Sequence, residues 1–514
     1  MGNLWKAIVG AALFVCIVFA AGCREDFEFA PSTGSLSFSK DTVFLDTVFA
    51  NIGSSTYQLK VYNTLNSDIS IPFIGLESGE SSSYRLNVDG LPGKTFRDIP
   101  LLAQDSLFIF IEINAPTPSE GNTEFLNTDF IAFGEGANTQ RIPLVTLVKD
   151  AIFLYPTTQS DGTQETLPIG LDEEGNEIRI SGFYLTDEEL NFTNEKPYVI
   201  YGYAAVEDGK TLQMAPGTRV HFHNDSGILV EAGGNLQING VVSEDPEILE
   251  NEVVFEGDRL EPDFENESGQ WGAIWFREGS VGNQIKNLTL RNATIGLLVE
   301  GDPDNVNNTL TLQESQILNS SQENLYARAA RISARNSVFG GANGVSVFLE
   351  SGGAYQFKHC TLANYAPRRM RSNPTLVLSN ESLIQTDGLV NALEEASFVN
   401  CIIDGSLSQE LQLTENTTVP FTFRFDHVAL KFPESGFDDE PLYNFSNSLR
   451  YNQVLQNVEL EFISPNTNEF QIQENSAAID AGFLEALNPI LFDILERNRT
   501  TPPDLGVYEF VGEN

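Results

Sequence analysis

Histidine and cysteine are scarce in this chain, and one residue of each type forms a neighbouring pair. The sequence has four histidines and four cysteines among 514 residues, and His359 directly precedes Cys360 in "GAYQFKHCTLANYA", residues 353–366. Such a pair can contribute to a metal site or to an activated thiolate. Either chemistry needs further partners at fixed geometry. The alternative is that a structural repeat placed the two residues side by side.

Two other segments have metal-binding character. His221 and His223 in "RVHFHND" share one face of a predicted strand, with Asp225 nearby, but a convincing third zinc ligand is missing. If their apolar neighbours point inward, both histidines are simply exposed. The acidic loop "GDPDNVNN", residues 301–308, lacks the distal glutamate and the spacing of an EF-hand. We therefore predict no metal site and no cofactor.

An arginine-rich loop is the strongest candidate for ligand binding. In "YAPRRMRSNP", Tyr365 lies close to Arg368, Arg369 and Arg371, in a chain that is poor in basic residues. Guanidinium groups suit carboxylates and sulfates, and aromatic rings stack on sugars. The structural alternative is a loop whose arginines pair with acids on neighbouring elements. We predict these four residues as a ligand-binding site.

An eight-residue pattern shows which elements position these residues. An apolar residue is followed after two positions by a small polar residue or histidine, after five by a second apolar residue and after seven by Asn or Gly. The five copies start at residues 285, 312, 334, 357 and 398, so the spacings are 27, 22, 23 and 41 residues. Periods in the twenties with strand-forming composition are typical of a solenoid.

The spacing inside the pattern indicates a bend. Two apolar residues five apart cannot share one face of a straight strand, so both point inward only if the chain turns a corner between them. Asn tolerates such a tight bend. We therefore predict coils of a right-handed parallel β-helix, a pectin-lyase-like solenoid, stacked about 4.8 Å apart.

The repeat also answers the question about the His–Cys pair. His359 takes the corner position of the fourth copy and Cys360 the position after it, so we interpret both as structural. Cys401 has the same position as Cys360 in the next copy, which leaves a disulfide between the two as an open alternative.

Catalysis on a β-helix would require carboxylates that converge on adjacent coils. Among the five copies the acids at pattern positions are Glu314 and Asp404, which lie in non-adjacent copies and at different positions. We therefore predict no catalytic residue. Trp271 and Trp275 in "WGAIWF" are either both buried or include one exposed sugar platform, and the sequence favours burial.

The N-terminus has the features of an export signal. Lys6 precedes the apolar run at 7–21, which is too short to span a bilayer and ends in "AAGC". This ending resembles the lipobox of bacterial lipoproteins, which implies that Cys23 carries the lipid anchor. A conventional signal peptide cleaved near Ala21 is the alternative. The following "REDFEF" resembles a surface-export signal of Gram-negative lipoproteins, which implies a lipid-anchored, surface-exposed protein of the outer membrane. A solvated tether is the alternative for this stretch.

The segment after this signal has the pattern of a sandwich. Short alternating runs such as "SLFIFIEINA" and "RIPLVTLV", with turns between them, predict an antiparallel sandwich over 35–149 that resembles immunoglobulin-like spacer domains. From about Lys196 to the C-terminus, segments such as "SGQWGAIWFREGSVGNQIKNLTLRNATIGLLVE" and "NSAAIDAG" resemble a family of right-handed β-helix lipoproteins. That resemblance implies fold and surface location and supplies no reaction.

These observations predict an all-β protein of six segments. They are a lipoprotein signal peptide (1–22), a tether (23–34), an immunoglobulin-like β-sandwich (35–149), a linker or cap (150–195), a right-handed parallel β-helix (196–480) and a C-terminal cap segment (481–514).

Charge limits the possible partners. The 72 acidic and 29 basic residues give a formal net charge of -43, which repels phosphate backbones and excludes nucleic acid as a favoured partner. The membrane is then reached only through the anchor on Cys23. We predict non-enzymatic binding or adhesion, with extracellular polysaccharide as ligand. A polysaccharide lyase or glycoside hydrolase of the β-helix type is the alternative, and a structural envelope component is a further one. The oligomeric state is not predicted.

Overall fold

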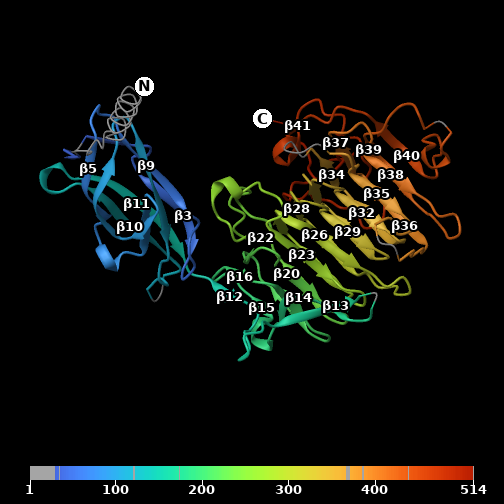
Figure 1. The fold of residues 1–514 in the computed structure, drawn as a ribbon. Helices are drawn as coiled ribbons and strands as arrows, with labels where there is room; N and C mark the ends of the chain where they lie inside the picture. The colour runs from blue at the N-terminus through green and yellow to red at the C-terminus, as the bar shows by residue number, and fades with distance from the viewer. Residues whose placement is uncertain are drawn as a thin grey trace, which may run out of the picture. The chain divides into compact units, whose positions relative to one another are not determined.

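The computed structural model divides the chain into two compact units, Met1–Lys149 and Asp150–Asn514 (Figure 1). It describes residues 29–33, 35–119, 122–172, 174–365, 371–384, 387–437 and 439–512. The predicted signal peptide and Cys23 lie outside these ranges. In the described part of the chain, no helix has the length and apolar character needed to cross a bilayer.

The first unit is a β-sandwich of two sheets around one core. Alternation explains its strands: in β9 (Ser106–Ile113) the residues Leu107, Ile109 and Ile111 are buried while Phe108 and Phe110 face solvent. One sheet contains β1 (Ala30–Pro31), β5 (Ile69–Leu76), β8 (Thr95–Leu101), β10 (Glu124–Phe133), β11 (Gln140–Lys149) and β3 (Val43–Phe49), and the other β2 (Leu36–Phe38), β4 (Tyr57–Asn63), β9, β6 (Tyr84–Val88) and β7 (Leu91–Gly93). The predicted sandwich is confirmed, except that it is not wholly antiparallel, because β1 pairs with β5 and β3 with β11 in parallel. Its immunoglobulin-like character stays a prediction.

The second unit is the predicted right-handed parallel β-helix. Its nineteen-stranded sheet bends within each coil to form two faces, made by β12 (Ile152–Leu154), β15 (Asn191–Phe192), β16 (Tyr198–Ile200), β18 (Thr211–Met214), β19 (Arg219–Phe222), β21 (Asn235–Asn239), β22 (Val253–Gly257), β24 (Asn283–Lys286), β25 (Leu288–Arg291), β27 (Leu310–Gln313), β28 (Gln316–Leu318), β30 (Arg331–Arg335), β31 (Val338–Gly340), β33 (Gly353–Lys358), β34 (Thr361–Asn364), β36 (Leu393–Val399), β37 (Ile402–Gly405), β39 (Arg424–Leu430) and β40 (Tyr451–Gln456).

A ten-stranded parallel sheet forms the third face of the coils, with one antiparallel pair at its start. Its strands are β13 (Thr166–Leu171), β14 (Glu177–Tyr184), β17 (Tyr203–Val206), β20 (Gly227–Val230), β23 (Trp271–Phe276), β26 (Ala293–Glu300), β29 (Leu325–Arg328), β32 (Val347–Glu350), β35 (Leu376–Ser379) and β38 (Leu411–Thr414). A hairpin, β41 (Phe462–Ser464) and β42 (Glu469–Ile472), follows the last coil. Short 3-10 turns lie in the connections: η1 (Gly79–Ser81), η2 (Gly136–Asn138), η3 (Asp187–Glu189), η4 (Pro262–Phe264), η5 (Pro441–Tyr443) and η6 (Pro465–Thr467).

The five copies of the eight-residue pattern stack as predicted. The first apolar positions are paired in register from coil to coil, as are the second ones, from Ile285 and Leu290 in the first copy to Phe398 and Ile403 in the last. The corner residues, Asn287, Glu314, Asn336, His359 and Asn400, all have φ between 44° and 53°. This left-handed backbone turns the chain between the two inward-facing positions.

Aromatic rings fill the later coils. Phe357 stacks on Phe398, Phe398 on Phe425 and Phe425 on Tyr451, with ring centroids 4.9, 5.1 and 5.6 Å apart. Each pair occupies directly paired positions of neighbouring strands, so the coil spacing itself sets the stacking distance. This stack supports the coils that carry the site described below.

The predicted ends of the β-helix differ from the structure. Residues in 150–195 do not merely link or cap, because β12 and β14 already pair in parallel with strands of the next coil. The segment after β40 does not close the end of the solenoid. It runs beside β34 and β37 (Figure 1), where Phe470 and Val507 share a core with Ala363 and Ile402, which face outward from the coils. Burial of these outward apolar side chains is the physical reason for this position.

Candidate functional site

The His359–Cys360 pair is buried and structural, as its place in the repeat indicated. His359 is 3% exposed, and its Nε2 lies 2.9 Å from the Nδ2 of Asn400, the corner residue of the next coil. Burial, reinforced by the charge of Arg499, lowers the pKa of His359 well below its ordinary value. Cys360 and Cys401 are both free thiols, so the disulfide is not formed. The backbone N–H of Cys360 donates to the Sγ of Cys401 at 3.4 Å.

The expectation that His221 and His223 are exposed together is wrong. His221 lies within β19, buried beside its paired residue Glu256, with Nδ1 3.5 Å from Oε1. His223 lies beyond the end of the strand and contacts Asp258, with Nδ1 2.7 Å from Oδ2. The two histidines therefore face different carboxylates. Within the described ranges, no three metal-ligating side chains form a group that would hold an ion.

The two tryptophans have different environments. Trp271 is buried and its Nε1 donates to the carbonyl of Arg291 at 2.9 Å. Trp275 is half-buried, with the guanidinium of Arg277 5.0 Å from its ring centroid. Trp271 and Trp275 are four residues apart and would face the same side of a regular strand, but a shift of register between Ala273 and Ile274 interrupts the alternation. Burial is therefore complete for only one of them.

The structure describes two of the four members of the predicted arginine loop, Tyr365 and Arg371. Arg368 and Arg369 lie outside the described residues. Arg371 is not available to a ligand, because its guanidinium is buried and pairs with Glu410, Nη2 to Oε2 at 2.8 Å. This is the structural alternative that the sequence left open. Tyr365 lines a cavity of the solenoid.

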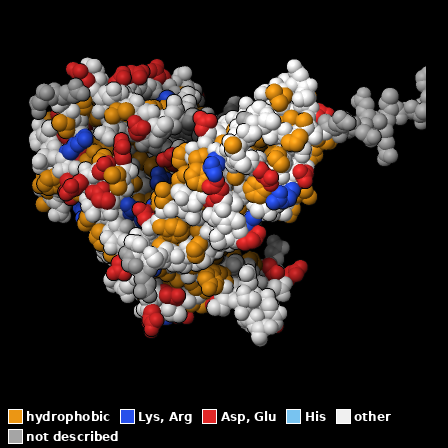
Figure 2. All heavy atoms as spheres, turned by 90° about the vertical axis from the view of Figure 1, so that its left-hand side faces the viewer, with side chains coloured by type: hydrophobic (Ala, Val, Ile, Leu, Met, Phe, Trp, Pro, Cys, Tyr) orange, Lys and Arg blue, Asp and Glu red, His pale blue; other side chains and the backbone are white. Residues whose placement is uncertain are grey.

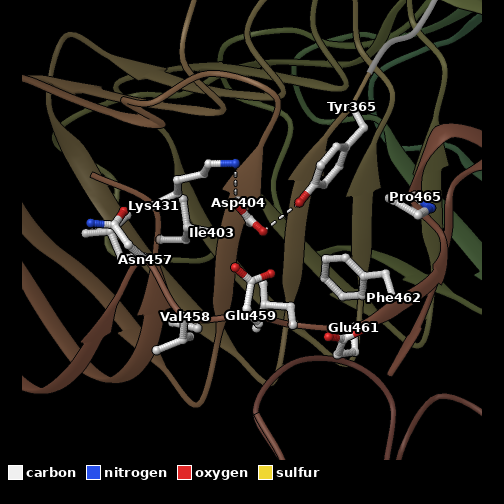
Figure 3. A pocket seen from close by; sticks show the side chains of 13 residues that line it. Tyr365, Ile403, Asp404, Lys431, Asn457, Val458, Glu459, Glu461, Phe462 and Pro465 are labelled. Atoms are coloured by element: carbon white, nitrogen blue, oxygen red, sulfur yellow. Dashed lines mark hydrogen bonds and ion pairs between the residues drawn. The ribbon is translucent and has the colours of Figure 1, made fainter. Parts of the chain in front are cut away.

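That cavity combines three neighbouring coils with the C-terminal segment (Figure 3). It measures about 200 Å³. Tyr365 follows β34, Asp404 lies in β37 and Lys431 follows β39, and these strands pair side by side. Residues 457–462 and Pro465 form the opposite wall. The parallel register brings the ends of the three strands, and so their polar side chains, to one place.

Asp404 is the most constrained polar group of this cavity. It is 7% exposed, and the Oη of Tyr365 donates to its Oδ2 at 2.6 Å. The N–H of Gly405 donates to Oδ1 at 2.8 Å, and the Nζ of Lys431 lies 3.7 Å from Oδ1. Lys431 in turn donates to the carbonyl of Gly405 at 2.6 Å. These contacts fix the carboxyl group with one edge toward the cavity.

Burial governs the ionisation of Asp404 and Tyr365. It raises the pKa of Asp404 above the ordinary value, although the hydrogen bonds from Tyr365 and Gly405 and the charge of Lys431 oppose the shift. Burial and the negative charge of Asp404 also raise the pKa of the Tyr365 hydroxyl. Tyr365 therefore stays protonated and acts as a hydrogen-bond donor.

A second carboxylate faces Asp404 across the cavity. Glu459 belongs to the C-terminal segment and is exposed, and Figure 3 shows its carboxylate directed toward that of Asp404. Glu461 lies on the same wall. The rings of Phe462 and Tyr365 lie edge to face, with centroids 6.3 Å apart. A buried, hydrogen-bonded acid opposite a solvated one can divide the roles of proton donor and proton acceptor.

Sequence reasoning found only part of this site. Tyr365 was predicted for its ring, and Asp404 was identified as an acid of the repeat but had no acidic partner on an adjacent coil. Its partner Glu459 lies in no copy of the pattern, so no periodic signal indicated it. Only the fold of 457–465 back onto the coils brings it to Asp404.

Comparisons with known proteins leave the reaction open. No family model matches the chain, and no curated protein matches it. It is similar to the catalytic unit of a thermostable GH87 α-1,3-glucanase from Streptomyces thermodiastaticus strain HF3-3, with 10% identity over 72% of this chain and 67% of that one and a TM-score of 0.24.

Two further solved structures show likenesses of the same low level. A GH87 α-1,3-glucanase catalytic domain gives 9% identity over 72% and 80% of the two chains, with a TM-score of 0.18. A family 123 glycoside hydrolase from Clostridium perfringens gives 9% identity over 24% of this chain, a TM-score of 0.17, and a match that spans 31% of that enzyme. At these values the function has to be argued from the geometry of the site.

Proposed function

We propose that this protein is a glycoside hydrolase whose reaction takes place between Asp404 and Glu459. The observation that carries the proposal is the meeting of two carboxyl groups in unlike environments across one cavity. Asp404 is buried and hydrogen-bonded, whereas Glu459 is exposed. Glycosidic bonds are cleaved by such pairs, one acting as acid and the other as base or nucleophile.

Asp404 is assigned the role of general acid. In its protonated form it gives its proton to the glycosidic oxygen while the bond from that oxygen to the anomeric carbon breaks. Glu459 takes a proton from a water molecule whose oxygen bonds to the anomeric carbon. The hydroxyl of Tyr365 and the ammonium of Lys431 position Asp404 and stabilise its carboxylate after proton transfer.

A lyase reaction is less compatible with the same residues. A lyase needs a base that removes a proton from a sugar carbon, and Tyr365 is unsuited because burial raises the pKa of its hydroxyl. A lyase acting on a uronate would also need positive charge for the substrate carboxylate, whereas Asp404 and Glu459 both line the cavity. The geometry therefore favours hydrolysis over elimination.

The location proposed for this enzyme is the outer face of a bacterial outer membrane. The support is the lipobox-like "AAGC", in which Cys23 would carry the acyl chains, and the sandwich that follows as a spacer. The test is incorporation of a labelled fatty acid into the full-length protein. Cys23→Ala should abolish the label and release the protein from the membrane; a labelled Cys23→Ala protein would contradict the proposal.

The test of the enzymatic function is product release from a panel of oligosaccharides. Wild-type protein should release reducing ends from at least one of them, and Asp404→Asn should lower the rate about 10²- to 10⁴-fold. Glu459→Gln should lower it similarly. Glu188→Gln, which changes an exposed acid far along the chain from the site, is the matched control. Binding of a glycan without any product would overturn the proposal in favour of adhesion.

A further inference from the structure

The cavity around Asp404 has an excess of negative charge. Asp404, Glu459 and Glu461 line it, and Lys431 is the one basic side chain among its described lining residues. The ammonium of Lys431 is already engaged, since it donates to the carbonyl of Gly405 at 2.6 Å and lies 3.7 Å from Asp404. No positive charge of the lining is therefore left for a ligand anion.

The exposed acids of the opposite wall are open to a ligand. Glu459 and Glu461 are both exposed, whereas Leu460 and Phe462 between and beyond them are buried. The ring of Tyr365 also lines the cavity, but the ammonium of Lys431 already lies 6.0 Å from its centroid. The carboxylates of the opposite wall are therefore the groups that attract a ligand ammonium.

We propose that the sugar bound in this cavity is an amino sugar with a free, protonated amine, held by Glu461 beside the catalytic pair. The proposal rests on the proposed hydrolase function and names its substrate class. Uronic acids and sulfated sugars would meet the exposed carboxylates of Glu459 and Glu461 and are repelled. A neutral sugar is accepted but gains nothing from the charge of the wall.

The charge of the whole chain also favours a cationic ligand over an anionic one. The formal net charge is -43, and Figure 2 shows acidic side chains spread over the visible face. Such a field raises the local concentration of cationic substrates and lowers that of anionic ones. The field is screened by salt, so the preference for the amino sugar should weaken as ionic strength rises.

The size of the cavity limits the contact to a small group. About 200 Å³ is less than the roughly 300–1,000 Å³ typical of sites for drug-sized ligands, so one sugar unit of a chain fits better than several. The cavity takes the ammonium-bearing unit, and the rest of the chain lies outside it.

The test compares three oligosaccharides that differ in charge. Glucosamine oligomers, N-acetylglucosamine oligomers of the same length and oligogalacturonate are titrated by calorimetry at about pH 6, where the amine is protonated and carboxylates are ionised. The glucosamine oligomer should bind about threefold more tightly than its N-acetylated counterpart at low salt, since the exposed carboxylate of Glu461 contributes about that factor. Oligogalacturonate should bind most weakly.

A variant of Glu461 tests whether this acid is responsible. Glu461→Gln should lower affinity for the glucosamine oligomer about threefold and leave affinity for the N-acetylated oligomer nearly constant. Glu188→Gln should change neither. Equal affinity for the charged and the N-acetylated oligomers, or the same loss for both ligands in Glu461→Gln, would overturn the amino-sugar assignment.

The two proposals fail in different ways. If the N-acetylated or another neutral oligomer is cleaved in an Asp404-dependent manner without any preference for the amine, the hydrolase function stands and the substrate class is wrong. If the glucosamine oligomer binds with the predicted dependence on Glu461 but is not cleaved, the substrate class stands and the hydrolase function is wrong.

Discussion

Tyr365 and Asp404 form the hydrogen bond on which the chemistry of the site depends. The phenol donates to the carboxylate at 2.6 Å, which stabilises the ionised form of Asp404 against the effect of its burial. If Asp404 acts as the acid, the rate falls as pH rises through its pKa, because the reactive form is the protonated one. Tyr365 is thus a positioning residue that also sets the pH above which the rate falls.

Tyr365→Phe should move the alkaline limb of the pH–rate profile to higher pH. The variant removes the hydrogen bond that lowers the pKa of Asp404, so burial raises that pKa further and the protonated acid persists to higher pH. Measurement of kcat against pH for wild type and variant checks this. A uniform loss of rate with an unchanged profile would contradict it.

Glu323 provides a separate test through stability. It lies in the turn between β28 and β29, and burial raises its pKa from 4.5 to about 7. The folded state therefore favours the protonated form, and the cost of the buried charge develops as pH rises from about 4.5 to about 7. No such cost exists below this window.

Glu323→Gln should accordingly stabilise the protein only at the upper end of that window. The free energy of unfolding should equal that of wild type near pH 4 and exceed it by on the order of 2 kcal/mol above pH 7. Denaturant unfolding at several pH values measures the difference. A gain that is the same at all pH values would show that ionisation of Glu323 is not its cause.

The corner of each coil is the element that the sequence predicted best. Two apolar residues five positions apart, most often with Asn between them, predict a corner, because both can point inward only if the chain bends between them. The left-handed backbone of the residue between them makes this bend. The C-terminal segment could not be predicted in the same way. Its contacts to Ala363 and Ile402 join residues that follow no common period, and the position of Glu459 depends on those contacts.

His359→Asn should preserve both stability and activity. Asn takes the same corner position in three other copies with nearly the same φ, so the backbone accepts it, and its amide is able to contact Asn400. We expect the free energy of unfolding to change by less than about 1.5 kcal/mol and product release to be unchanged. Loss of activity in a folded His359→Asn protein would restore His359 as a reactive group.

The buried pair of Arg371 and Glu410 fixes the end of the arginine loop to the next coil. Both side chains are almost completely buried, and Glu410 also accepts hydrogen bonds from Thr375 and from the N–H of Leu407. Arg371→Ala leaves an uncompensated buried carboxylate and should cost about 3–5 kcal/mol in thermal or denaturant unfolding.

An apolar double variant is the control for this pair. Arg371→Met combined with Glu410→Leu removes both charges and should lose clearly less stability than Arg371→Ala alone. A double variant that is as unstable as the single one would show that the lost hydrogen bonds, and not the unpaired charge, dominate.

At the scale of the whole molecule, composition predicted the fold class, whereas the candidate site around Asp404 could be identified only from the fold. The strand-rich, acidic chain predicted an all-β protein that does not bind nucleic acid, and the two units have that all-β architecture. In the loop predicted from its arginines, Arg371 serves the packing of the coils, while binding by Arg368 and Arg369, which lie outside the described residues, stays a prediction. In this acidic chain one of the few guanidinium groups, that of Arg371, neutralises the buried carboxylate of Glu410 and is therefore not free for a ligand.

The role of Asp404 as the acid is tested most directly by varying the leaving group of the substrate. A natural sugar leaving group needs a proton, whereas a dinitrophenolate leaves without one. Asp404→Asn should therefore lose about 10²- to 10⁴-fold in rate on an oligosaccharide and only a small factor on the dinitrophenyl glycoside of the same sugar. Equal losses on the two substrates, in a variant that unfolds like wild type, would contradict proton donation by Asp404.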